Sequence, residues 1–274
     1  MSNISIFAKP PFEMKHLQRV SSIIRGEQIA AYMLNCRLNP TSGYEDDTCI
    51  YVKPHIRPGT DYKFEKHSYV DVHDGFELRH TLRKYPEVGA IAISDHSAYV
   101  LGQYVKNKIV IIPHHHCNFE RTTRVRDKIR KVGITGSAQA FPFVPDVIKE
   151  GLKKRDILYE EYSNFYPRLS VARFHYSLDI HLVWRPWKKG LSSPLKVTNA
   201  MAFGVPTIAL DLDEPSYKEV EGCYIGVKTP EEWLEKLDEL IANSKMYQDM
   251  SKFCLEKVER YHISEIAKLY KELL

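Results

Sequence analysis

Short apolar runs that alternate with helical patterns constrain the fold of this chain most. A run such as Ile4–Phe7 or Gly89–Ile93 has the length of a strand, and residues with apolar side chains at helical spacing follow it. Strands separated by helices pair in parallel, because each helix returns the chain to the same edge of the sheet. The pattern therefore predicts an α/β protein with parallel sheets.

The predicted elements extend along the whole chain. The strands are Ile4–Phe7, Cys49–Val52, Ser68–Val72, Gly89–Ile93, Lys108–Ile112, Lys131–Thr135, Asp179–Trp184, Val205–Leu210 and Cys223–Val227. The helices are His16–Leu34, Phe76–Lys84, His96–Val105, Pro145–Lys154, Pro194–Phe203, Pro230–Asn243 and Ile263–Leu274. Gly26 is expected to weaken or divide the first helix.

The strand–helix rhythm breaks at residues 113–130, and this break predicts two units, 1–112 and 113–274. A basic run lies in the break: Arg121, Arg124, Arg126, Lys128, Arg130 and Lys131. A solvated linker or helix face is the favoured interpretation of this run, and a surface for an anionic partner is the alternative.

Bulk composition excludes several classes of protein. The chain has 274 residues, 43% of them hydrophobic, and a net charge of +4. It contains no apolar run of the roughly 20 residues that a membrane helix needs, and its N-terminus does not read as a secretion signal. The five cysteines are scattered and form no CxxC pair, as expected of reduced thiols. We therefore expect a cytoplasmic protein without a membrane span.

The segment from Asp179 to Ala209 resembles the donor-binding segment of GT-B glycosyltransferases. In those enzymes a strand leads through a loop into a helix that reads roughly Pro-x-Lys-x-x-Glu-Ala-Met-Ala-x-Gly, and a strand follows. The matching residues here are Pro194, Lys196, Ala200, Met201, Ala202, Gly204 and Pro206. The close match covers about 30 residues, and a weaker likeness spans the C-terminal half.

This resemblance implies a GT-B architecture, with two Rossmann-like domains facing across a cleft. The N-terminal acceptor-side domain would be reduced, and the last helix, about 263–274, would cross back to it. The implied activity is metal-independent transfer of a hexosyl or pentosyl group from a nucleotide-diphosphate sugar to an acceptor hydroxyl. No cofactor is implied, because the nucleotide sugar is a substrate.

The donor site is expected at the carboxyl ends of the C-terminal strands, where parallel sheets bind ligands. Ser192 and Ser193 precede a helix that begins at Pro194, and a helix N-terminus attracts phosphate. Arg185 and Lys196 would add cationic partners for a diphosphate. The loop Gly136–Ser137 is a weaker candidate, resting on its place at the first strand-to-helix turn.

Two residues depart from the family's pattern. Asn199 stands where the helix usually carries the Glu that binds the donor ribose, and we include Asn199 among the donor-binding candidates. Leu191 stands where retaining families carry the first Glu of their Glu-x7-Glu motif. Retaining chemistry is therefore not supported by motif.

Candidates for a general base follow strands of the N-terminal unit. Asp71, His73 and Asp95 each carry a group that could deprotonate an acceptor hydroxyl. His114, His115 and His116 are expected to line the cleft, where one of them contacts phosphate or acceptor. Adjacent residues of an extended chain point to opposite sides, so no metal site is expected there.

Two alternatives to this enzyme remain at the level of sequence. One is a catalytically reduced GT-B-like binding protein, which the Asn199 and Leu191 departures would suit. The other is a glycosyltransferase that acts on modified bases of DNA, for which the basic run is the sole support. The sequence does not identify the sugar, the nucleotide, the stereochemistry or the oligomeric state. It also leaves open whether the acceptor is a glycan, a small molecule or modified DNA.

Overall fold

A computed structural model describes residues 3–8, 20–54, 61–187, 190–211 and 213–274, which form two compact units. The first unit contains the described residues up to His115 together with 190–193 and 263–274. The second contains the described residues from His116 to 187 and from Pro194 to His262. The boundary thus lies three residues beyond the division expected after residue 112, and the final helix belongs to the first unit.

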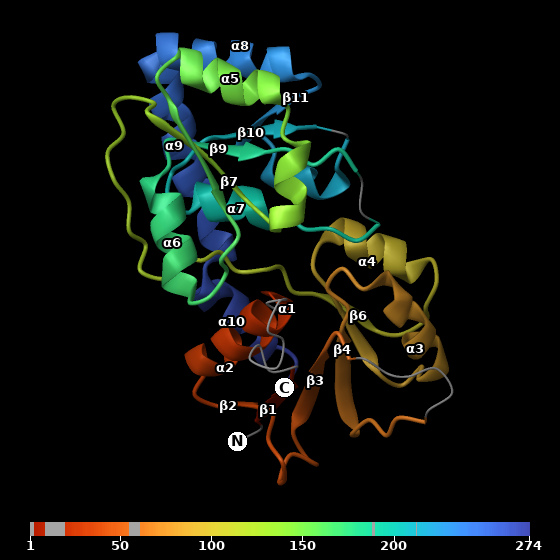
Figure 1. Ribbon diagram of the computed structural model, residues 1–274. Coiled ribbons are helices and arrows are strands. Elements are labelled where there is room, and N and C mark those ends of the chain that lie inside the picture. Colours follow the sequence, from red (N-terminus) through yellow and green to blue (C-terminus); the bar gives the residue numbers. More distant parts are fainter. Residues whose placement is uncertain (1–2, 9–19, 55–60, 188–189, 212) are drawn as a thin grey trace. The chain divides into compact units, whose positions relative to one another are not determined.

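The first unit is built on a parallel sheet of six strands in the order β2-β1-β3-β4-β5-β6 (Figure 1). The strands are β1 Ile4–Phe7, β2 Cys36–Leu38, β3 Thr48–Val52, β4 His67–Asp71, β5 Gly89–Ala92 and β6 Ile109–Ile111. The helical segments are α1 Val20–Ser22, the π-helical Ile23–Glu27, α2 Gln28–Tyr32, the 3₁₀ turn Phe76–Leu78, α3 Arg79–Lys84, α4 Asp95–Gly102 and α10 Ile263–Lys271.

The second unit has a parallel sheet of five strands in the order β11-β10-β9-β7-β8. The strands are β7 Lys131–Thr135, β8 Leu158–Tyr162, β9 Ile180–Val183, β10 Thr207–Leu210 and β11 Tyr224–Val227. The helices are α5 Asp146–Lys154, α6 Arg168–Ser177, α7 Leu195–Met201, α8 Pro230–Ala242 and α9 Ser244–Val258, with 3₁₀ turns Ala138–Phe143, Pro215–Val220 and Glu259–Tyr261. The predicted α/β class with parallel strands is confirmed.

Sequence reading missed β2, β8, α6 and α9, and the reason is the same for the two strands. Both lie at an edge of their sheet, and the five residues of β8, Leu-Tyr-Glu-Glu-Tyr, are partly or fully exposed. An edge strand needs no continuous apolar run, because only one neighbour covers it and charged side chains protect its open side. The apolar pattern on which the prediction relied is therefore absent from these segments.

Gly26 lies where the first α-helix is divided, as expected from propensity. It lies within the π-helical Ile23–Glu27, which joins α1 to α2, while residues 16–19 of the predicted helix fall outside the described ranges. A Cβ at this position would lie 2.8 Å from the Cβ of Ala8. Because Gly26 has no side chain, the helix can pack closely against the residue that follows β1.

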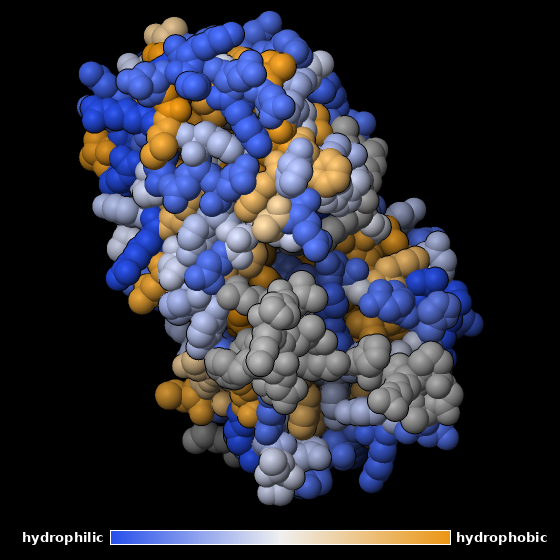
Figure 2. Space-filling view, viewed as in Figure 1, coloured by the Kyte–Doolittle hydropathy of each residue, from blue (hydrophilic) through white to orange (hydrophobic). Residues whose placement is uncertain are grey.

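Two apolar layers enclose the sheet of the second unit. Residues of α6, α7 and α9 form one layer, which includes Phe174, Met201 and Cys254. Residues of α5 and α8 form the other, which includes Leu152 and Trp233. The outward sides of α5 and α8 are largely hydrophilic (Figure 2). Among the described residues no helix is long and apolar enough to cross a membrane.

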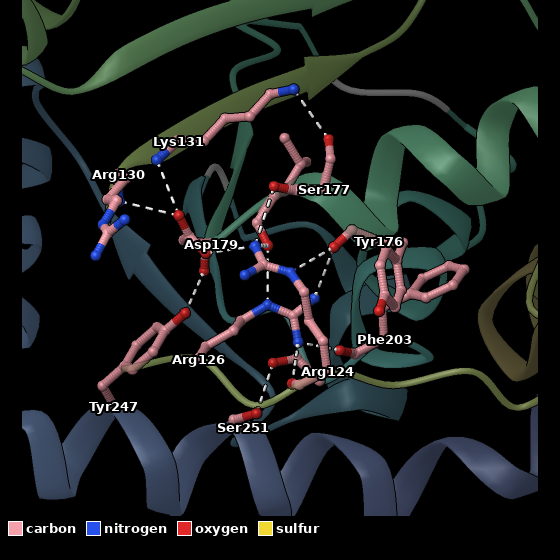
Figure 3. Close-up of polar contacts among 12 residues, drawn as sticks. Arg124, Arg126, Arg130, Lys131, Tyr176, Ser177, Asp179, Phe203, Tyr247 and Ser251 are labelled. Carbon is pink, nitrogen blue, oxygen red and sulfur yellow. Dashed lines mark hydrogen bonds and ion pairs between the residues drawn. The ribbon is translucent and has the colours of Figure 1, made fainter. Parts of the chain in front are cut away.

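Arginines of the basic run hold the second unit together (Figure 3). Arg124 binds Asp179 at 2.5 Å, and Asp179 also accepts hydrogen bonds from the backbone N–H groups of Arg130 and Lys131 at 2.9 and 3.0 Å. Arg126 is buried and donates to the carbonyls of Leu178 and Phe203, at the ends of α6 and α7. Burial, with help from Arg124, lowers the pKa of Arg126 to about 10. The alternative of an anionic-partner surface is therefore wrong for Arg124 and Arg126.

Candidate functional site

The strand order of the second unit identifies where a ligand would bind in it. From β7 the chain moves outward to β8 and then crosses to β9 on the other side of β7. Sheets of this order bind ligands at the carboxyl ends of the two strands where the direction reverses. The loops after β7 and β9 carry Gly136, Ser137 and Arg185, so three of the predicted donor-binding residues lie at this switch point.

Lys196 lies directly over the loop after β7. Its Nζ is 3.3 Å from the position that a Cβ at Gly136 would occupy. The side chain of Lys196 reaches this loop from the first turn of α7, the helix that follows β9. A side chain at residue 136 would push the ammonium group away, so the glycine allows a positive charge to sit close to the backbone at the switch point.

A pair of buried histidines lies beneath this charge. His181 Nε2 is 3.2 Å from Thr135 Oγ1, and the ring centroids of His175 and His181 are 5.1 Å apart. Burial lowers the pKa of His175 to about 3. Burial first, and then the neighbouring His175 and Lys196, hold the pKa of His181 well below its usual range. Both rings are therefore neutral at physiological pH.

Arg185 lies beside the same strand ends but is paired within the protein. Its guanidinium binds the carboxylate of Glu214, a buried residue in the loop after β10. Sequence reasoning missed Glu214, because nothing in its local pattern distinguishes it from other loop acids. A diphosphate that bound Arg185 would have to share it with this carboxylate, which makes Arg185 a weaker phosphate partner than its charge alone suggests.

The remaining donor-binding candidates have other partners. Asn199 Oδ1 accepts a hydrogen bond of 2.8 Å from the backbone N–H of Cys117, so Asn199 fastens α7 to the chain entering the unit. Ser192 and Ser193 belong to the first unit. The Ser192 carbonyl accepts from Ser94 Oγ at 3.0 Å, and the nearby Leu191 packs in that unit's core.

A polar cluster occupies the carboxyl ends of β3, β4 and β6 in the first unit. Lys53 and His73, which follow β3 and β4, have left-handed backbones with φ of 44° and 52°. Non-glycine residues adopt this conformation at a cost, and such residues concentrate at functional sites. Asp74 joins the two, with its Oδ1 2.6 Å from Lys53 Nζ and 2.8 Å from His73 Nδ1.

The charge of Asp74 is secured by these partners. Burial by itself would raise its pKa, but the hydrogen bonds and charges of His73 and Lys53 outweigh it and lower the pKa. A carboxylate on Nδ1 of a histidine directs the basic lone pair to Nε2, if Nδ1 carries the proton. His73 Nδ1 also accepts a hydrogen bond of 2.8 Å from the backbone N–H of Asp74, so this ring nitrogen has both a donor and an acceptor beside it. That His73 acts as the general base stays a prediction.

The three consecutive histidines have three different environments, and all are buried. His114 Nδ1 lies 2.9 Å from Ser193 Oγ, and its ring lies 4.6 Å from that of His73. Burial, with the charges of His73, Arg25 and His115, holds the pKa of His114 well below its usual range. His115 Nε2 lies 3.0 Å from the Ile24 carbonyl, and the ring of His116 packs on His262. Only His114 joins the strand-end cluster, and that the three histidines line a cleft stays a prediction.

Asp71 is not placed to act as a base, and this part of the prediction is wrong. Its side chain is 0% exposed, and Oδ2 binds Arg25 Nε at 2.6 Å. Arg25 is itself buried and donates to the carbonyls of Ile112 and Pro113 at 2.8 and 2.9 Å. β4 ends at Asp71, and the chain turns beyond it through the left-handed backbone at His73.

Asp95 lies at the exposed start of α4. The helix is capped by Ser94 rather than by Asp95, since Ser94 Oγ accepts from the backbone N–H of Ser97 at 3.0 Å. Ser94 is therefore the N-cap, and Asp95 occupies the first turn, where its charge favours the helix dipole. Within the described ranges no group of three side chains suited to binding a metal ion occurs.

Comparison with known proteins found a relative in sequence. No protein-family model matches the chain. An uncharacterized glycosyltransferase of Haemophilus influenzae is 32% identical over 132 residues, which are 46% of this chain. The match spans 36% of that relative, so the matched part of this chain covers about a third of the relative's length.

Solved structures show the likeness over nearly the whole chain. HepE of Anabaena, in complex with UDP, superimposes with a TM-score of 0.67 at 9% identity, covering 98% of each chain. A DNA-modifying β-glucosyltransferase gives a TM-score of 0.59 at 13% identity, covering 99% of each chain. A UDP-forming α,α-trehalose-phosphate synthase from Burkholderia vietnamiensis gives 0.58 at 10%, covering 93% of this chain and 76% of the other. The fold is therefore that of GT-B glycosyltransferases, as the sequence resemblance implied.

Proposed function

We propose that this chain is a glycosyltransferase that moves a sugar from a nucleotide-diphosphate sugar to an acceptor hydroxyl. The observation that carries the proposal is the position of Lys196 Nζ over Gly136 at the switch point of the second sheet. A cation held against a glycine turn at this place suits the diphosphate of a donor. HepE, a similar structure that binds UDP and UDP-glucose, favours a uridine nucleotide.

In this proposal, residues of the second unit stabilise the leaving group, and residues of the first unit accept the proton. Lys196, and Arg185 after it leaves Glu214, would stabilise the negative charge that grows on the leaving diphosphate. His73 Nε2 would accept the proton of the acceptor hydroxyl, with Asp74 holding the imidazole and stabilising its charged form. Cationic side chains take the place that a metal has in other transferases, so we propose that the reaction needs no metal.

A panel of nucleotides in a thermal melting experiment tests the proposal. UDP and UDP-sugars should raise the melting temperature of the wild-type protein, because a ligand of the folded state stabilises it by mass action. EDTA should leave the shift unchanged. Absence of any shift with uridine, guanosine, adenosine and thymidine diphosphates would refute a nucleotide-sugar site.

The binding-protein alternative is kept because of Asn199. This residue replaces the acidic side chain of the family's helix, and its oxygen is already bonded to Cys117. A reduced donor site would bind nucleotide without turning it over. Release of UDP from UDP-sugars, in the presence of acceptor or by slow hydrolysis, separates an enzyme from such a protein.

A further inference from the structure

One face of the first unit carries two arginines that no carboxylate neutralises. Arg79 and Arg83 lie four residues apart on α3, so their side chains share one side of the helix. Neither forms an ion pair with any residue that the structure describes. Arg155 and Arg168, in contrast, are neutralised by Asp238 and Glu120.

Aromatic rings hold both guanidinium groups in place. The Arg79 guanidinium carbon lies 4.0 Å from the ring centroid of Phe76 and 5.8 Å from that of Tyr104. The Arg83 guanidinium carbon lies 5.7 Å from the same Tyr104 ring. Each arginine also donates once to a nearby carbonyl, Arg79 to Phe76 at 2.8 Å and Arg83 to Tyr104 at 2.7 Å. Since a guanidinium has five N–H donors, most of them remain available for an outside acceptor.

The pair is accessible in part, since Arg79 is half-buried and Arg83 is exposed. Tyr104 is 43% exposed, and Tyr99 of α4, at 69%, is the most exposed tyrosine in the described ranges. The one acidic residue of the segment Phe76–Tyr85 is Glu77, and it pairs with neither arginine. Because the rings already hold the two arginines in place, less side-chain entropy is lost when they bind an anion that accepts two hydrogen bonds at once.

We propose that this face, formed by Arg79, Arg83 and Tyr104, binds single-stranded nucleic acid through its phosphodiester backbone. Guanidinium groups bind phosphate oxygens two at a time, and interleaved exposed aromatic rings are typical of surfaces that follow a single-stranded chain. The large exposed hydrophobic residue of this face is a tyrosine, not one of the aliphatic side chains that insert into a bilayer. That the nucleic acid is the sugar acceptor rests on the proposed function, and it fits the start of the Phe76–Lys84 helical segment three residues after His73.

Fluorescence anisotropy with a labelled oligothymidylate tests this face. The wild-type protein should bind the probe, with an affinity that falls as salt rises. Arg79→Gln with Arg83→Gln should weaken binding about tenfold for each arginine at low salt. The same variant should reduce the slope of log affinity against log salt by about 1.4, since each single-strand phosphate contact contributes about 0.7. Arg79→Lys with Arg83→Lys, which keeps the charge but not the planar fork, should regain most of the slope and less of the affinity.

Matched controls separate this face from general basicity. Lys153→Gln with Lys154→Gln removes two exposed cations from α5 in the other unit and should leave binding unchanged. The proposal would be overturned if the wild-type protein did not bind the oligonucleotide, or if both double variants lost the same amount of affinity. It would also be overturned if Arg79→Gln with Arg83→Gln lost binding to anionic lipid vesicles but kept its binding to the oligonucleotide. The UDP-induced melting shift should be the same in all variants. Failure of that shift alone would instead count against the proposed transferase.

Discussion

The two sheets of this protein have closely related strand orders, yet their carboxyl ends carry different chemistry. In the second unit the switch point holds a glycine turn with Lys196 above it and neutral histidines below. In the first unit the strand ends hold His73, Asp74 and Lys53, two of them in left-handed backbone conformations. One end suits the binding of an anion, and the other suits the transfer of a proton. The sheet supplies the positions, and the loops decide what is done there.

The largest effect should come from a residue that serves neither end. Asp71→Asn is expected to lower the free energy of unfolding by about 3–5 kcal/mol, because it leaves the buried Arg25 without its counter-charge. Urea denaturation measures this loss. Asp74→Asn is the control, since Asp74 is partly exposed and should cost far less. Normal stability together with lost turnover in Asp71→Asn would return Asp71 to the list of bases.

His73→Ala should abolish the proposed proton transfer while sparing the donor site. Turnover of the nucleotide sugar should fall roughly a hundredfold or more, and UDP affinity should stay the same, because His73 and the donor residues lie in different units. Steady-state kinetics and calorimetric titration with UDP measure the two effects. Turnover within a few fold of wild type would show that the base lies elsewhere.

Lys196→Met should have the opposite signature. We expect UDP binding to weaken by about 1.5–3 kcal/mol, the range for a hydrogen bond to a charged group. Lys228→Met is the matched control, because Lys228 is another cation at the carboxyl end of the same sheet but binds the Asp211 carbonyl at 2.7 Å. If calorimetry showed that Lys228→Met weakens UDP binding more than Lys196→Met does, the donor would lie over β10 and β11 instead.

Acid should weaken the second unit through its buried histidines. The pKa of His175 falls from 6.5 to about 3 on folding because the ring is buried. Its contribution to stability is therefore complete above about pH 6.5 and is lost as the pH falls toward 3, since the unfolded chain binds the proton more readily. Between pH 7 and pH 5 this amounts to about 2 kcal/mol for His175. Urea midpoints at the two pH values measure this loss of stability. In His175→Leu the difference in stability between the two pH values should be smaller. If the difference were as large as in the wild-type protein, His175 would not be its source.

Much of the fold could be predicted because burial imposes a local pattern. The strands with apolar runs, such as Lys131–Thr135, were located to within a residue or two, and the GT-B likeness followed from one segment of about 30 residues. Edge strands such as β8 escaped, because their stability comes from a neighbour rather than from their own side chains. The candidate site divided in the same way: Lys196 was predicted from the motif and Gly136 from its position at the first strand-to-helix turn, whereas Glu214 and Asp74 were not given these roles.

The amino-acid sequence by itself determined the class of fold, the alternation of strand and helix, and the segment where a donor would bind. Only the tertiary structure decided which charged side chains are engaged inside the protein. Asp71 and Asp74 are both carboxylates near the end of one strand, yet one is buried on Arg25 and the other is shared by His73 and Lys53. Arg126 and Arg83 are both arginines, yet one closes helix ends and the other lies on an aromatic ring at the surface. These assignments depend on partners distant in sequence, and a carboxylate or guanidinium carries no local sign of which partner it will meet.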